Sequence, residues 1–182
     1  MKQIWYIYFF MFFMMISCSQ NGKNGGPGNT IRNRAMEIAI KYAKDKLKEP
    51  KETVAKDGIV TIVDNQVNFV TSSAYQVRYV IDPQKIEVGL IDDDENEDAI
   101  VPISSINGQD LEIPEHLIII KTDGKFILSR VIETNMKILG IKNRIITAEV
   151  STRSLNSPLR NCSVCKEVVK YKFRLGDLIK IE

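Results

Sequence analysis

The sequence predicts an α+β domain in which one N-terminal amphipathic helix packs on a curved antiparallel sheet. Residues 31–48 repeat apolar side chains at three- and four-residue spacing, which is the period of a helix. After Pro50 the chain consists of short runs that alternate apolar and polar residues, as half-buried strands do. Turn-forming pairs such as Asp123-Gly124 separate successive runs. One helix followed by a long meander of strands is typical of the α+β class.

The helix is expected to start at a cap formed by Asn29 or Thr30. It ends at Glu49, because a residue before proline is disfavoured in the α conformation. Its apolar face is formed by Ile31, Ala35, Ile38, Ala39, Tyr42, Ala43 and Leu47. Its other side carries Arg32, Arg34, Lys41, Lys44, Lys46 and Lys48. A basic amphipathic helix can lie on a membrane, but this apolar face is rich in alanine and lacks Trp and Phe. We therefore expect it to pack on the sheet.

The strands follow in one long series. They are expected at residues 59–63, 67–70, 75–81, 85–91, 99–103, 117–121, 126–132, 136–141, 144–150, 167–175 and 178–181. The clearest hairpin turns at 122–125, where Asp-Gly is a strong turn signal. Further turns are expected at 142–143 and 176–177, and a polar stretch is expected to lead up to Pro114.

A hydrophobic leader precedes the domain. Lys2 is a minimal positive region, and Ile4 to Ile16 form thirteen unbroken apolar residues. At about 1.5 Å per residue this run spans roughly 20 Å, short of the ~30 Å hydrocarbon core of a bilayer. A cleaved signal peptide over residues 1–17 therefore fits better than a permanent spanning helix. The small, polar and glycine-rich residues 18–29 then predict a flexible tether.

The leader ends in Met15-Ile16-Ser17-Cys18, which resembles the lipobox of bacterial lipoprotein precursors. The resemblance implies that Cys18 carries the lipid, such as palmitate, and that the peptide before it is removed. Two or three acyl chains hold a protein firmly on a membrane. Ser19, rather than Asp, after the cysteine implies the outer membrane by the sorting pattern of many Gram-negative bacteria. The alternatives are an ordinary secretory signal cut near Ser17 or Ser19, and an uncleaved short anchor.

Size and charge limit what the mature chain can be. Without residues 1–17 it has 165 residues, which suits a single domain, expected over 30–182. Lys2 is the only charge in the leader, so the mature chain keeps 24 of the 25 basic residues against 23 acidic ones. This near-neutrality argues against a nucleic-acid partner, which requires a strongly basic surface. We expect no cofactor.

Two cysteines remain once Cys18 is lipidated, and they lie close together as Cys162 and Cys165. An even pair in an exported protein indicates a disulfide. Zinc would need four ligands, and the chain offers no second cysteine pair and a single histidine. A thioredoxin-like redox pair would open a helix, whereas this pair is expected to open a strand. Free thiols or a redox role remain the alternatives to a disulfide.

The acidic loop at 92–98 places Asp92, Asp94, Asn96 and Asp98 at alternating positions, a spacing that calcium loops use. The match to an EF-hand then fails, because Glu97 stands where the tight turn needs glycine. A solvated acidic loop is the simpler interpretation. These four residues are kept as weak calcium candidates.

His116 is the only histidine, so a hydrolase that used histidine as its base would have to use this one. No Gly-x-Ser-x-Gly motif or other nucleophile context accompanies it. A strand-end histidine without a catalytic role is the simpler interpretation, and we expect no enzyme activity.

The last long strand alternates. Its expected core-facing side chains are Val169, Tyr171, Phe173 and Leu175, and its solvent-facing ones are Lys170, Lys172 and Arg174. The basic side could instead meet an acidic partner or phosphate headgroups.

The order of one helix and then strands resembles cystatin-like and nuclear-transport-factor-2-like folds. The runs 38–50 and 75–82 are also similar to the start of small bacterial export-pathway domains of unknown function. Neither resemblance transfers functional residues.

We therefore expect a membrane-anchored envelope lipoprotein acting as a non-catalytic protein-binding module, either an accessory subunit or an immunity-type inhibitor. The alternative is a module that binds a lipid, glycan or small molecule in the concave face of its sheet. Aromatic side chains that could line such a cavity are Phe69, Tyr75, Tyr79 and Phe126, although packing in the core is the simpler interpretation of them. An envelope enzyme is the least favoured alternative.

Overall fold

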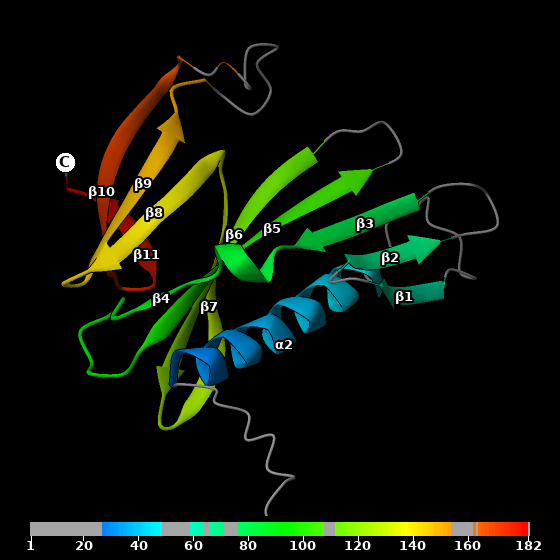
Figure 1. The fold of residues 1–182 in the computed structure, drawn as a ribbon, viewed down its shortest axis with the longest axis horizontal. Helices are drawn as coiled ribbons and strands as arrows, with labels where there is room; N and C mark the ends of the chain where they lie inside the picture. The colour runs from blue at the N-terminus through cyan, green and yellow to red at the C-terminus, as the bar shows by residue number, and fades with distance from the viewer. Residues whose placement is uncertain are drawn as a thin grey trace, which may run out of the picture.

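The computed structural model has one helix and two antiparallel sheets, arranged as three layers (Figure 1). It describes residues 27–48, 59–63, 66–70, 76–107, 112–153, 162 and 164–181. A seven-stranded sheet, here the large sheet, lies in the middle. The helix covers one of its faces, and a four-stranded sheet, here the small sheet, packs against the other. The predicted class, a helix packed on antiparallel sheet, is confirmed.

The helix and the large sheet come first in the chain. Their elements are α2 (Pro27–Lys48), β1 (Ile59–Val63), β2 (Gln66–Val70), β3 (Gln76–Ile81), the short 3₁₀ helix η1 (Pro83–Lys85), β4 (Glu87–Gly89), β5 (Asp98–Asn107), β6 (Glu112–Thr122) and β7 (Lys125–Glu133). The strand order is β1-β2-β3-β5-β6-β7. The short strand β4 pairs with the first residues of β5, while β3 pairs with the later ones.

The small sheet follows as a four-strand meander. Its strands are β8 (Met136–Lys142), β9 (Ile145–Ser151), β10 (Lys166–Arg174) and β11 (Asp177–Lys180), in the order β11-β10-β9-β8. β8 is thus an edge strand of this sheet within the described residues, and it is the strand that contacts β4 of the large sheet.

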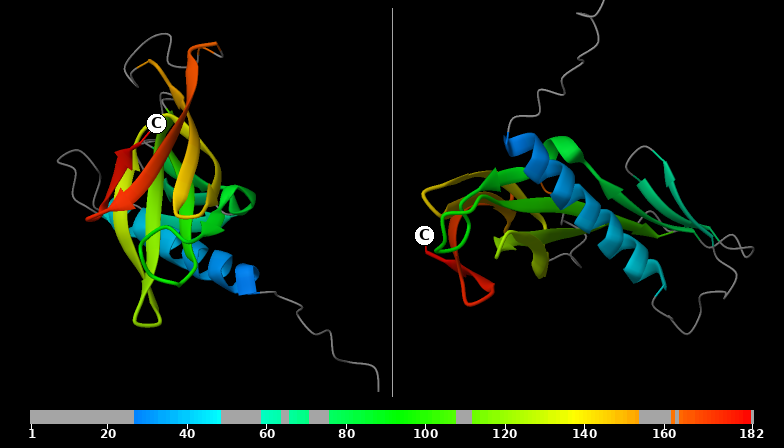
Figure 2. Two further views of the ribbon diagram at one scale, coloured as in Figure 1. Left: turned by 90° about the vertical axis from the view of Figure 1, so that its left-hand side faces the viewer. Right: turned by 90° about the horizontal axis from the view of Figure 1, so that it is seen from below.

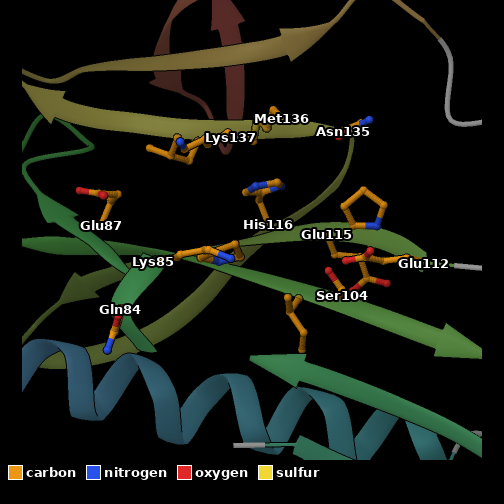
Figure 3. Close-up of a pocket in the computed structure, with 14 residues that line it drawn as sticks. Gln84, Lys85, Glu87, Ser104, Glu112, Glu115, His116, Asn135, Met136 and Lys137 are labelled. Carbon is orange, nitrogen blue, oxygen red and sulfur yellow. The ribbon is translucent and has the colours of Figure 1, made fainter. Parts of the chain in front are cut away.

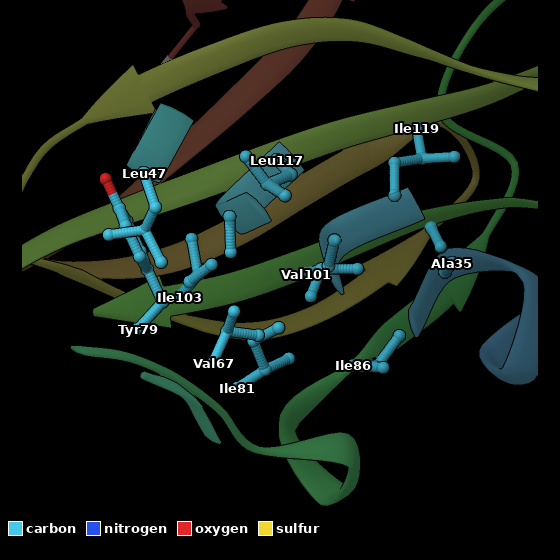
Figure 4. Close-up of a cluster of buried hydrophobic side chains, with 13 residues drawn as sticks. Ala35, Leu47, Val67, Tyr79, Ile81, Ile86, Val101, Ile103, Leu117 and Ile119 are labelled. Carbon is cyan, nitrogen blue, oxygen red and sulfur yellow. The ribbon is translucent and has the colours of Figure 1, made fainter. Parts of the chain in front are cut away.

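The helix packs as its apolar pattern predicts. Ala35, Ala39 and Ala43 are fully buried, and their small side chains let α2 lie close to the strands. Seen from below, α2 runs diagonally across the large sheet (Figure 2). The side chains that it covers include Val67, Tyr79, Ile81, Ile86, Val101, Ile103, Leu117 and Ile119 (Figure 4). The helix begins at Pro27, so it includes residues 27–29, which we had assigned to the tether.

The central strands are buried on both faces. On β6, Leu117 and Ile119 face the helix layer while Ile118 faces the small sheet. Ile100 on β5 likewise belongs to the second core, with Met136, Ile138, Ile146, Ala148 and Phe173 of the small sheet. Strands buried on both faces lack a polar side, so their sequences are continuous apolar runs. This second layer was not predicted.

All three hairpins predicted after residue 117 form, each with two turn residues at positive φ. The pairs are Asp123-Gly124, Asn143-Arg144 and Leu175-Gly176. This conformation matches the twist of the flanking strands. The second and third turns therefore lie one residue away from the predicted 142–143 and 176–177. Leu175 is consequently a fully exposed turn residue, and its predicted core-facing position was wrong.

Two further strand predictions need correction. Residues 85–91 were expected to form one strand, but η1 takes the start and β4 keeps only Glu87–Gly89. The polar stretch expected before Pro114 is partly strand, because β5 continues to Asn107 and β6 begins at Glu112. Pro114 itself lies opposite Ser104 in the ladder.

Candidate functional site

A pocket of about 390 Å³ opens where the large sheet meets the edge strand β8 (Figure 3). We call it the seam pocket. Its volume falls in the range of small-molecule sites. It is lined by Gln84, Lys85, Glu87, Pro102, Ile103, Ser104, Glu112, Pro114, Glu115, His116, Asn135, Met136, Lys137 and Ile138. Most polar side chains around it come from η1, β4 and β6 on one side and β8 on the other.

The strand register explains which side chains face the small sheet. Ile100 faces that sheet, and Glu87 lies directly opposite it in the ladder. Side chains alternate along a strand, so Pro102 and Ser104 share the face of Ile100. His116 lies opposite Pro102 and therefore shares it too. These positions form one wall of the seam pocket.

The two sheets come into contact at Gly89 of β4. A Cβ on this residue would stand 2.9 Å from Cβ and Cγ2 of Ile141 on β8. That separation is too short for ordinary packing, so glycine is what allows β4 and β8 to touch. This contact joins β4 of the large sheet to the edge strand of the small sheet.

His116 is the most deeply buried polar side chain of the seam pocket. It stands between β6 and β8 (Figure 3) and is 2% exposed. Burial lowers the pKa of its ring to about 4, opposed in part by a hydrogen bond with the backbone of Met136. The ring is therefore neutral near pH 7. Its Nδ1 atom is buried and has no hydrogen-bond partner among the described residues.

Glu115, the next residue, faces the opposite layer. Its carboxylate accepts a hydrogen bond of 2.7 Å from the hydroxyl of Tyr42 on α2. Burial, and then the bond to Glu115, raise the pKa of Tyr42 well above its ordinary value. The ring of Tyr42 also meets Tyr79 edge-on, with centroids 6.5 Å apart. Glu115 thus ties the helix to the large sheet, while the ring of His116 hydrogen-bonds a backbone group and no carboxylate.

The calcium candidates take part in hydrogen bonds within the 92–98 loop and with its neighbours. Asp98 is fully buried, and its two carboxylate oxygens accept hydrogen bonds from the amides of Ile91 and Lys121 at 3.0 and 2.9 Å. Burial raises the pKa of Asp98, and these two amides oppose the shift. Asp98 therefore acts as a clamp between neighbouring segments of the large sheet.

The other three candidates form the loop itself. Asp92 accepts from the amide of Asp94, and Asp94 accepts from the amide and side chain of Asn96. Arg144 donates to the carbonyls of Asp92 and Asp94, which holds the loop against the β8–β9 turn. Across the described ranges, no group of three or more His, Cys, Asp or Glu side chains is placed to hold a metal ion.

The predicted disulfide between Cys162 and Cys165 is present, with Cα atoms 5.2 Å apart. It closes a short turn just before β10. The carbonyl of Cys165 accepts from both the amide and the hydroxyl of Thr152, at 2.9 and 3.2 Å. The bridge therefore fixes the chain where it re-enters the small sheet.

The basic side of β10 faces acidic neighbours. Lys166 pairs with Glu149 at 2.7 Å, and Lys172 lies 3.9 Å from Asp93. On the other side, Val169 and Phe173 are buried as predicted. The basic stripe is thus partly neutralised within the protein, which weakens it as a site for acidic partners.

Two of the four aromatic residues pack in or against the core, which was the simpler interpretation of them. Tyr79 belongs to the core beneath α2, and Phe126 packs against that core. Tyr75 and the side chain of Phe69 lie outside the described residues, as do Cys18 and the leader. Sequence reasoning missed the seam pocket, because its walls come from strands distant in sequence. Its residues at the start of β8 and just before it, Asn135 to Ile138, follow no motif.

Comparisons with protein-family models, with curated proteins and with solved structures yield no match for this chain. In the part of the chain that the structure describes, no helix has the length and apolar character needed to cross a membrane.

Proposed function

We propose that this chain is a lipid-anchored, non-catalytic binding module of the bacterial envelope, and that it holds a small molecule in the seam pocket. The observation that carries the proposal is His116, whose buried Nδ1 lacks a partner beside a pocket of about 390 Å³. An unsatisfied buried polar atom costs about 1–3 kcal/mol and is uncommon in native proteins. A ligand that donates a hydrogen bond would remove this cost once binding shifts the ring so that Nδ1, which is buried in the unliganded protein, meets the donor.

A binding role fits the pocket better than catalysis. A histidine base is usually oriented by a second group, as the carboxylate of a triad does. Here the ring hydrogen-bonds the backbone of Met136, and Glu115 is engaged by Tyr42 on the other face of the strand. A ring with a pKa of about 4 is also a weak base near neutral pH.

The anchor is proposed from the lipobox resemblance at Cys18, and the outer membrane from Ser19. The test is metabolic labelling with palmitate in the native host. We expect label on the wild type and on a Cys162→Ser/Cys165→Ser variant, and none on Cys18→Ala. Equal labelling of Cys18→Ala would remove the anchor from the proposal.

The pocket is tested by native mass spectrometry of the full chain purified in detergent from its own envelope. We expect a co-purified small molecule, with a lower bound fraction in Lys137→Met. Lys142→Met is the matched control, because Lys142 lies on the same strand but outside the pocket lining. An unloaded wild type, or equal loading of the two variants, would contradict the proposal.

A protein partner is the second candidate, favoured by a groove between α2 and β7. It is lined by Ile38, Lys41, Tyr42, Asp45, Lys46, Phe126, Ile127 and Leu128. β7 ends the described part of the large sheet, and Ile127 on it is 46% exposed. An edge strand beside an apolar groove can accept an added strand. Photo-crosslinking from position 127 in cells should capture one protein, whereas position 164, on the disulfide turn, should not.

The resemblance to cystatin-like and nuclear-transport-factor-2-like folds remains part of this proposal. It is supported by a single long helix that crosses an antiparallel sheet. The second candidate, an accessory or immunity-type role, would use that scaffold to meet a protein.

A further inference from the structure

We propose that the seam pocket binds a linear aliphatic diamine, whose two ammonium groups pair with Glu87 and Glu112 at opposite ends of the pocket. This inference rests on the proposed function and adds the chemical class of the small molecule.

The two carboxylates face the same space. Glu87 lies opposite Ile100 of β5, which faces the small sheet. Glu112 lies four residues before His116 on β6, so the two side chains share the face that lines the pocket. Figure 3 shows Glu87 and Glu112 on either side of His116. The pocket thus carries one carboxylate toward each of its ends.

These two carboxylates are available to a ligand. Neither is engaged in a hydrogen bond or an ion pair with another described residue. Arg78, on the same face of the large sheet as Glu112, lies two strands away and outside the lining. The third glutamate of the lining, Glu115, faces the helix layer and accepts a hydrogen bond from Tyr42. A carboxylate beside apolar side chains is poorly solvated, so a cation that pairs with Glu87 or Glu112 is favoured.

The two lysines of the lining do not neutralise these carboxylates. The ammonium group of Lys85 pairs with Asp82 at 3.2 Å. Lys137 alternates with two buried residues of β8 and stands opposite Glu149, so its ammonium group lies on the other face of that strand. The ring of His116 is neutral near pH 7 and adds no positive charge. The pocket is therefore acidic, which favours a cationic ligand.

The spacing of the carboxylates indicates the form of the cation. Glu87 and Glu112 lie opposite Ile100 and Ile106 of β5, which are six residues apart. At about 3.3 Å per residue, these positions are roughly 20 Å apart along the strand. A single ammonium group cannot contact both carboxylates, whereas a chain with an ammonium group at each end can. The apolar side chains of the lining, which suit a methylene chain, are Pro102, Ile103, Pro114, Met136 and Ile138.

The test titrates full-length protein, purified in detergent, with amines of different length and charge. Diaminobutane and diaminooctane carry two ammonium groups near pH 7, and octylamine carries one. Calorimetry at physiological ionic strength gives the affinities. The imidazole of His116, the only histidine, reports by NMR whether the pocket is occupied. We expect diaminooctane to shift the ring resonances and to bind about tenfold more tightly than either other amine, because it alone combines two charges with the longer chain.

Substitution of each carboxylate tests the proposed contacts. Glu87→Gln and Glu112→Gln keep the shape of the side chain and remove its charge, so each should weaken diaminooctane about tenfold. Glu97→Gln is the matched control, because Glu97 is exposed on the acidic loop and lies outside the lining. Lys137→Met changes a wall of the pocket and no carboxylate, so it tests loading of the pocket rather than the class of the ligand.

The outcomes separate this inference from the function beneath it. Equal binding of diaminooctane to wild type, Glu87→Gln and Glu112→Gln would place the amine elsewhere and overturn the inference. Equal affinities of octylamine and diaminooctane would show that one carboxylate is sufficient, and would overturn the two-ended ligand. No ring shift with any amine, alongside a co-purified ligand without amino groups, would overturn the ligand class while the proposed function stands. Equal loading of Lys137→Met and Lys142→Met would instead contradict the proposed function.

Discussion

Acidification should destabilise this protein through His116, and the effect can be isolated because no other histidine exists. Burial lowers the pKa of the folded ring from 6.5 to about 4. The unfolded chain therefore binds a proton more readily than the folded chain, and stability falls as the pH drops from about 6.5 to 4. Each unit of difference in pKa is worth about 1.4 kcal/mol, so His116 should account for about 3 kcal/mol of lost stability at pH 4.

The charges near the ring do not change this expectation. The charged residues that line the same pocket are Lys85, Lys137, Glu87, Glu112 and Glu115. Desolvation is nevertheless the largest cause of the lowered pKa, and no neighbouring charge is among its causes. Because the ring is 2% exposed, solvent screening removes little of the effect.

The assay compares wild type with His116→Gln, which cannot titrate in this range. Urea unfolding followed by circular dichroism gives the free energy of unfolding of each protein between pH 4 and 7. Carboxylates that titrate in this range contribute to both proteins and largely cancel in the difference. We expect wild type to lose about 3 kcal/mol more than His116→Gln between pH 7 and 4. Parallel pH profiles would show that the ring is not held neutral by burial, and would refute the reasoning.

Three substitutions test other parts of the fold by their free energy of unfolding. Asp98→Ala removes the acceptor of the amides of Ile91 and Lys121 and should cost about 3 kcal/mol. Asp93→Ala, at a side chain that is 78% exposed, should change the free energy of unfolding little. Equal effects of the two substitutions would contradict the clamp. Gly89→Ala should cost about 1–3 kcal/mol because its new methyl group meets Ile141 at 2.9 Å, and an unchanged urea midpoint would show that β4 and β8 can separate freely. Leu175→Asn should stabilise by about 1 kcal/mol, since Asn tolerates φ of +52° better than Leu does; a lower melting temperature would count against this.

Local patterns predicted the elements more successfully than the layers. The helix and the hairpin turns depend on neighbouring residues, so the alanine-rich stripe of α2 and the pair Asp123-Gly124 were sufficient signals. The turn at Leu175-Gly176 was misplaced because leucine rarely takes positive φ, and alternation alone put Leu175 on the strand. The run from Leu117 to Ile120 did carry a signal for a second layer, since a strand without a polar side is covered on both faces.

The seam pocket depends on contacts that no local pattern encodes. His116 and Met136 are brought together only when β8 turns back over the large sheet. The close contact of β4 with β8 depends on Gly89, which is a single glycine in the sequence. In the sequence, Lys137 and Glu87 resemble ordinary exposed charged residues. Their position beside the pocket follows only from the contact between β8 and β4. Composition could therefore argue against a nucleic-acid partner, but it could not locate the seam pocket.

Glu115 and His116 explain why the pocket lies at the boundary between the layers. Consecutive side chains on a strand point to opposite faces, so this one dipeptide reaches both neighbours of the large sheet. Glu115 accepts from Tyr42 and fixes the helix, while His116 hydrogen-bonds the backbone of Met136 and fixes the edge strand β8. Both side chains are buried and polar, and each would be costly to leave unpaired. The helix layer is satisfied within the protein, whereas the small-sheet side retains the open acceptor at Nδ1. The hydrogen-bond pairing is thus incomplete on the face of β6 that lines the seam pocket.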